Sequence, residues 1–194
     1  NTRPRRRLAA GGLRCGAEAG RISPAMDLIP EITARRTVRK YSSQSVDKAA
    51  LDRVLEAARL APSAKNRQEW RFVVVQKKDL RQRLQEAAFG QDYVGSAPVA
   101  IAACTTNIDY RMPNGQLSYP IDLAFAASYM TLQAVREGLG STVVTTFDEQ
   151  AIQEILTVPY TMRVVMLVLI GHADEAPEPT PRKPLKRVVS FNHW

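Results

Sequence analysis

One polar connection in the sequence carries side chains well suited to hold a ligand. It lies between a predicted helix that ends at Leu60 and an apolar run that begins at Phe72, and a proline keeps it out of helical structure. Short hydrogen-bonding groups gather there beside one large aromatic ring, that of Trp70. This mixture suits a planar polar ligand, although an ordinary connection closed by a core tryptophan would have the same composition. The candidate binding residues are Pro62, Ser63, Ala64, Asn66 and Gln68.

A basic segment lies upstream, at the edge of an apolar one. It places four cations and a hydroxyl within residues 35–40. Guanidinium forks and a hydroxyl are what a phosphate group or the edge of a flavin requires. A solvated charged face would also be basic, so this segment alone leaves both interpretations open. Its candidate binding residues are Arg35, Arg36, Thr37 and Arg39.

Together, the two stretches resemble the paired signature of the FMN-dependent nitroreductase family. Residues 35–41 read Arg-Arg-Thr-x-Arg-x-Tyr, and residues 61–70 read Ala-Pro-Ser-Ala-x-Asn-x-Gln-x-Trp. The resemblance extends from about Leu28 to Trp194, with further similar segments at residues 138–141, 147–148 and 181–185. Two positions depart from the usual pattern: Glu69 replaces a proline, and Thr145-Thr146 stands where a glycine normally precedes Phe-Asp.

The resemblance implies an enzyme that uses NAD(P)H and FMN to reduce nitroaromatics, quinones or a related small acceptor by ping-pong hydride transfer. The flavin carries the chemistry, so no catalytic side chain is expected, and Arg39 is expected to tune the ring. Further FMN contacts are expected from Thr145, Thr146, Arg182 and Lys183. An FMN-binding or flavin-modifying relative without nitroreductase activity stays open, because the usual glycine is missing.

The resemblance also implies an α+β fold of three layers, α/β/α, with a central sheet of four or five mainly antiparallel strands. It implies a homodimer that exchanges C-terminal arms. In that arrangement residues 35–39 of one subunit and residues 62–66 of the other would form each FMN site.

Other chemistries find little support in the sequence. His172 and His193 are the only histidines, and neither lies at ligand spacing from a cysteine or a carboxylate pair, so no metal site is predicted. Nucleophile-elbow, phosphate-loop and Gly-x-Gly-x-x-Gly patterns are missing too. A cofactor must therefore carry any difficult chemistry, and the lack of a dinucleotide fingerprint favours FMN over FAD.

The first 25 residues have a composition of their own. They hold six arginines and one glutamate, a net charge of +5, which leaves +3 of the chain's +8 for residues 26–194. We expect a disordered basic leader that is not native, placed before a natural start at Met26. A transit peptide or a nucleic-acid-binding arm are alternatives, but no aromatic residue interleaves with the arginines to stack on bases, so no nucleic-acid partner is predicted.

The elements that position these segments alternate along one domain, residues 26–194. Predicted helices cover residues 46–60, 79–88, 119–138 and 148–156, and predicted strands cover residues 72–76, 98–104, 141–147 and 163–170. Residues 90–96 and 105–118 are expected as loops. The first strand is expected to be buried on both faces, and the apolar helix 119–138 to be buried nearly all round.

Prolines after Gly171 indicate an extended arm, residues 174–194, whose apolar side chains need another surface to pack on. No apolar run approaches the ~20 residues that span a bilayer, so no membrane partner is expected. Only Cys15 and Cys104 are present, which favours a reducing cytoplasm over a disulfide scaffold. Cys104 is expected as a small core residue.

Overall fold

The structure is a computed structural model that describes residues 27–194. Residues Leu28–Pro179 form one compact unit, and Thr180–Trp194 belongs to a separate one. The predicted leader, residues 1–25, lies outside the described residues. No helix in the described part of the chain is long and apolar enough to cross a membrane.

A single four-stranded sheet forms the centre of the larger unit. Its strands are β1 (Trp70–Val75), β2 (Val99–Thr105), β3 (Gly140–Val144) and β4 (Arg163–Gly171), in the order β1-β2-β4-β3. All three neighbouring pairs are antiparallel. This confirms the predicted α+β class and gives the sheet four strands, with β1 and β3 at its two edges.

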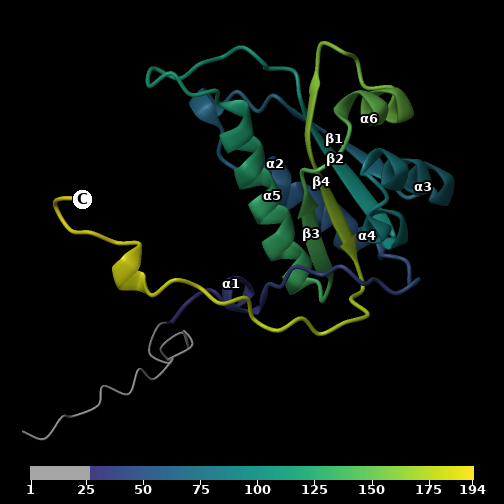
Figure 1. The fold of residues 1–194 in the computed structure, drawn as a ribbon, viewed down its shortest axis with the longest axis horizontal. Helices are drawn as coiled ribbons and strands as arrows, with labels where there is room; N and C mark the ends of the chain where they lie inside the picture. Colours follow the sequence, from purple (N-terminus) through teal and green to yellow (C-terminus); the bar gives the residue numbers. More distant parts are fainter. Residues whose placement is uncertain (1–26) are drawn as a thin grey trace, which may run out of the picture. The chain divides into compact units, whose positions relative to one another are not determined.

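Helices cover both faces of the sheet (Figure 1). One face carries α2 (Lys48–Arg59) and α5 (Tyr119–Arg136), with the short α1 (Pro30–Ala34) beside α5. The other carries α3 (Lys78–Ala87), α4 (Asp92–Ser96) and α6 (Glu149–Leu156). Two short 3-10 turns complete the set: η1 (Ala64–Asn66) and η2 (Leu185–Arg187). The three-layer arrangement matches the prediction.

The core has two halves, one on each face of the sheet. In β4, Val168 and Ile170 face the α2–α5 side, whereas Leu167 and Leu169 face the α3–α6 side. All four side chains are fully buried, which follows from the alternation of side chains along a strand at the centre of a three-layer domain. Cys104 is buried in the second half, as predicted.

Helix boundaries follow the signals in the sequence closely. The side chains of Asp47 and Asp148 cap α2 and α6, accepting hydrogen bonds from the backbone N–H groups of Ala50 and Ala151 at 3.1 Å. The helix α5 stops before Gly138, whose φ of +71° is a conformation that glycine adopts readily.

The prediction of a loop at residues 90–96 is wrong, because α4 occupies Asp92–Ser96. The two glycines there suggested a turn. Tertiary contacts outweigh this local tendency: Val94 is fully buried, and the Arg81 guanidinium donates hydrogen bonds to the carbonyls of Gly95 and Ala97, both at 2.6 Å.

Two burial predictions are also wrong. The strand β1 is not buried on both faces, because it is an edge strand and its central side chains stay partly exposed. The helix α5 is not buried all round in the single chain. It exposes an apolar stripe at Ile121, Phe125 and Tyr129, whose side chains are 37%, 45% and 41% exposed.

Candidate functional site

The basic segment lies along the β3 edge of the sheet. Thr37 forms a parallel bridge with Ser141, and the Val38 N–H donates to the Ser141 carbonyl at 3.0 Å. The approach is close: a Cβ on Gly140 would lie 2.7 Å from a methyl carbon of Val38. Glycine at position 140 therefore allows the basic segment to pack against the sheet.

A carboxylate after β4 fixes the next two residues of the segment. The backbone N–H groups of Arg39 and Lys40 both donate to Oε1 of Glu175, at 2.5 and 3.1 Å. The Asp174 N–H in turn donates to the Lys40 carbonyl at 2.9 Å. Residues that are distant in the sequence therefore hold the main chain around Arg39 in place.

Arg39 belongs to a small cluster that also contains Thr146. Its guanidinium carbon lies 5.8 Å from the centre of the Tyr93 ring, within the range of a cation–π contact. The Tyr93 hydroxyl donates to Gln91, and the Gln91 amide donates to the Thr146 carbonyl at 2.9 Å. Two predicted site residues far apart in the sequence are therefore brought together through Gln91 and Tyr93.

The other two arginines of the segment lie nearer to α1. The Arg36 guanidinium donates to the carbonyls of Thr33 and Arg35, at 2.7 and 3.0 Å. Arg35 is half-buried, and within residues 27–194 its guanidinium makes no hydrogen bond or ion pair to another side chain. Of the two, Arg35 is better placed to receive an anion.

The loop at residues 62–68 is rigid and strained. The Gln68 N–H donates to Ser63 Oγ at 3.0 Å, and the Ala64 N–H donates to Asp122 of α5 at 2.9 Å. Lys65, Asn66 and Gln68 each have a φ of +53°, a left-handed conformation that costs a side-chain-bearing residue on the order of 1–3 kcal/mol. Strain of this kind is typical of binding loops whose surroundings fix their shape.

Trp70 itself is a core residue. It is 7% exposed, and its ring stacks on Phe72 with 6.4 Å between the ring centres. Of the two interpretations left open for this side chain, the structure supports the tryptophan that closes the connection. The ligand-binding potential of the loop rests on its polar residues instead.

The loop and the basic segment lie at opposite edges of the sheet. The loop leads into β1, whereas Thr37 lies beside β3. Three strand spacings of ~4.8 Å separate these edges by about 14 Å. A single chain therefore brings Arg39 and Thr146 together but keeps Ser63 and Asn66 away from them.

Arg182 and Lys183 belong to the separate unit Thr180–Trp194, in which both are exposed. The Arg182 guanidinium donates to the carbonyls of Thr180 and Pro181, at 3.2 and 3.3 Å. Their role in binding stays a prediction.

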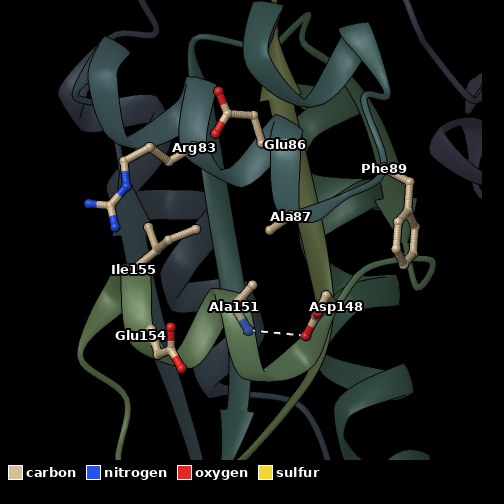
Figure 2. Close-up of a pocket in the computed structure, with 8 residues that line it drawn as sticks. All are labelled: Arg83, Glu86, Ala87, Phe89, Asp148, Ala151, Glu154 and Ile155. Atoms are coloured by element: carbon tan, nitrogen blue, oxygen red, sulfur yellow. Dashed lines mark hydrogen bonds between the residues drawn. The ribbon is translucent and has the colours of Figure 1, made fainter.

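A hollow of about 380 Å³ lies between α3 and α6, and none of the predicted site residues lines it. Figure 2 shows Arg83 and Glu86 projecting from α3, with Ala151, Glu154 and Ile155 opposite them on α6. Phe89 and Asp148 complete its wall together with Ala87.

Sequence reasoning missed three aromatic or amide residues next to the candidate site. Gln91 and Tyr93 link Arg39 to Thr146, and Tyr110 lies against the loop, with the Arg67 guanidinium carbon 4.1 Å from its ring centre. Each tyrosine stands in a segment expected as a polar loop. An aromatic side chain in a segment expected to be polar was the signal that could have identified these tyrosines as part of a binding site.

Known proteins share the sequence pattern and the fold of this chain. A family model described as "Nitroreductase family" matches residues 32–92 and 89–172. An NADH dehydrogenase of Thermus thermophilus is 32% identical over 197 residues, covering 86% of this chain and 96% of its own.

Two solved structures share the fold. An FMN-dependent nitroreductase of Clostridium difficile has a TM-score of 0.75 at 30% identity, covering 86% of this chain and all of its own. The NADPH:FMN oxidoreductase of Vibrio harveyi, in complex with NAD⁺, has a TM-score of 0.77 at 26% identity, covering 85% of this chain and 76% of its own.

Proposed function

The chain belongs to the nitroreductase family, and we propose that it is an FMN-dependent oxidoreductase that uses NAD(P)H to reduce nitroaromatics, quinones or a related small acceptor. The names of its relatives support both cofactors: one is an FMN-dependent nitroreductase, and another is an NADPH:FMN oxidoreductase. The observation that carries the proposal is the cluster of Arg39 and Thr146, since it joins two predicted flavin-binding residues from distant parts of the chain.

The donors and acceptors of the site suit FMN. Guanidinium groups at Arg35 and Arg39 can neutralise a phosphate and a ring edge that gains negative charge. In the loop, Ser63 Oγ accepts one internal hydrogen bond and keeps its own hydrogen for donation. The Asn66 side-chain oxygen likewise accepts from Gln68, which leaves its NH₂ group for the ligand.

Bound FMN would supply the redox chemistry between NAD(P)H and the acceptor. The side chains have supporting tasks. Arg39 holds a permanent positive charge at the ring, where reduction adds negative charge, and so favours electron uptake. Arg35, together with Arg36 and the arm's Arg182 and Lys183, neutralises the phosphate. Thr37, Pro62, Ala64 and Gln68 orient the ribityl chain and the ring, and Thr145 lies beside the Thr146 carbonyl at the same place.

Each site is shared between two copies in this proposal. The opposite-edge placement of residues 35–39 and 62–68 supports sharing, because one copy alone does not surround a ligand with both groups. The apolar stripe on α5 supplies a surface for the partner, since Ile121, Phe125 and Tyr129 stay exposed in one chain. We also propose the reducing cytoplasm that the sequence favours, where a buried thiol such as that of Cys104 stays reduced.

The direct test is the absorption spectrum of the purified protein before and after anaerobic NAD(P)H. We expect a flavin spectrum that bleaches on addition of the donor and recovers with a quinone or nitroaromatic. Cofactor released by heat should be FMN by chromatography. Recovery of FAD, or a colourless protein that FMN cannot reconstitute, would contradict the assignment.

The alternative of a flavin-binding or flavin-modifying protein without nitroreductase activity rests on Thr145 and Thr146. Both are exposed and bring Cβ atoms to a segment where the family usually has glycine. A bound flavin that neither NADPH nor NADH bleaches would favour this alternative over the reductase.

A further inference from the structure

Two exposed cations flank one aromatic ring at the candidate flavin site. The Lys65 ammonium lies 5.3 Å from the centre of the Tyr110 ring, and the Arg67 guanidinium carbon lies 4.1 Å from it. Tyr110 comes from the long loop between β2 and α5, so a second segment helps to hold both cations. Contacts of this kind fix the direction of long, flexible side chains.

The backbone of the loop supports the same arrangement. Lys65 has a φ of +53°, and it follows Ala64, whose N–H is tied to Asp122 at 2.9 Å. Gln68, on the other side of Arg67, is tied back to Ser63 at 3.0 Å. The two cations therefore project from a turn with little freedom to move.

The charge of this cluster is incompletely balanced. Glu69 lies 3.9 Å from the Arg67 guanidinium, which is beyond hydrogen-bonding distance. Lys65 has no carboxylate within 4.0 Å in the part of the chain that the structure describes. Asp122 also lies at this loop, but its carboxylate accepts the Ala64 N–H at 2.9 Å and forms no ion pair with either cation. The two cations can therefore receive an anionic group on a molecule that docks against the loop.

We propose that Lys65 and Arg67 bind the 2′-phosphate of the nicotinamide donor and make the protein prefer NADPH to NADH. This inference rests on the proposed function, which places the loop beside FMN and hence beside the donor. NADPH and NADH differ only in this phosphate, which replaces a neutral hydroxyl and carries about two negative charges near pH 7. A lysine and an arginine offer the charge and the donors that such a group needs.

The test compares kcat/KM for the two donors in the wild type and in charge-removing variants. Lys65→Asn suits the left-handed backbone, because asparagine tolerates positive φ, and Arg67→Gln keeps much of the side-chain length. A charge-assisted contact of ordinary strength corresponds to roughly tenfold to a hundredfold in affinity. We expect the wild type to favour NADPH by a factor in this range, through KM rather than kcat. The double variant should lose that preference, because its kcat/KM should fall much more for NADPH than for NADH.

Lys65→Arg keeps the charge and should keep most of the preference, whereas Lys77→Gln, at an exposed lysine before α3, should change nothing. Binding of 2′,5′-ADP measured by calorimetry gives a readout independent of turnover: it should weaken in the double variant by the same factor, while binding of 5′-AMP should not.

Three results would overturn the inference. A wild type with equal kcat/KM for NADPH and NADH would remove it and leave the proposed function intact. The inference would also be wrong if the double variant lost kcat/KM equally for both donors, or only for an anionic electron acceptor. Lys65 and Arg67 would then have a function other than binding the 2′-phosphate. A flavin that neither donor reduces would remove the proposed function and this inference with it.

Discussion

Two arginines of one segment are proposed to have different tasks. Arg39 is expected at the flavin ring and Arg35 at the phosphate. We predict that Arg39→Ala mainly lowers the reduction potential of the bound flavin, with a smaller effect on the affinity of the protein for FMN. Arg35→Ala should mainly lower the affinity for FMN. Loss of a charge-assisted contact should cost about 1.5–3 kcal/mol in either case.

Spectroelectrochemistry and FMN titration separate these two effects. Lys40→Ala is the matched control, because Lys40 is an exposed cation of the same segment that lies outside the proposed contacts. If both arginine variants lost FMN equally and kept the same potential, the division of roles would be wrong.

Tyr41 gives a prediction about pH. Its hydroxyl is buried and makes no hydrogen bond of acceptable geometry among the described residues. The neighbouring Thr142 hydroxyl donates to the Val38 carbonyl, and its influence on Tyr41 is smaller than that of burial. Burial raises the pKa of Tyr41 to about 12 from an ordinary value of 10.0. As the pH rises, the unfolded chain loses this proton near pH ~10, whereas the folded chain keeps it until pH ~12. The free energy of unfolding should therefore keep its full value below pH ~10 and decrease between pH ~10 and ~12.

The variant Tyr41→Phe should lose this alkaline decline. It should also be as stable as the wild type at pH 7 or more stable by about 1 kcal/mol, because it removes a buried polar atom without a partner. Urea unfolding at several pH values measures both effects, with Tyr160→Phe, at a tyrosine 68% exposed, as the control. A large loss of stability at pH 7 would show that the hydroxyl has a partner.

At the scale of elements, α5 helps to shape the binding loop. Its Asp122 accepts the Ala64 N–H at 2.9 Å and so ties the loop to the first turn of the helix. We predict that Asp122→Ala weakens FMN binding about tenfold, as expected for one lost charge-assisted hydrogen bond, with a smaller effect on stability.

FMN titration and thermal unfolding test this prediction together. Asp79→Ala removes an acidic residue from the first turn of α3 and serves as the matched control. Equal FMN affinity in the two variants would mean that the loop keeps its shape without Asp122.

The elements themselves were largely predictable, because periodic apolar patterns and capping residues act locally. All four long helices and all four strands appear within a few residues of the predicted positions. The position of each strand in the sheet and the burial that follows from it could not be predicted. Nothing local to β1 reveals that it lies at an edge, and no pattern in residues 90–96 shows that Val94 fills the core and induces a helix.

Sequence motifs predict which residues form the candidate site, but they do not predict how those residues are arranged. Motif residues identified Arg39 and Thr146, yet only the fold shows that Gln91 and Tyr93 connect them. The separation of the loop and the basic segment depends on strand order, because it arises from β1 and β3 lying at opposite edges.

Each FMN site of the whole molecule is proposed to be shared between two copies of the chain. The exposed stripe of α5 needs a cover, and the apolar residues Val188, Phe191 and Trp194 of the arm need a surface. A homodimer with twofold symmetry would provide both surfaces twice and would create two equivalent FMN sites.

A mixed dimer provides the sharpest test of the shared FMN site. One copy carries Arg35→Ala and Arg39→Ala, the other carries Ser63→Ala and Asn66→Ala, and two different affinity tags allow the mixed dimer to be purified. Each variant alone would have both sites damaged and should hold little FMN. The mixed dimer would have one intact site and one doubly damaged site, so we predict about half of the wild-type FMN content and NAD(P)H-dependent activity. A mixed dimer no better than its parents, or a monomer that holds FMN at full occupancy, would contradict the shared site.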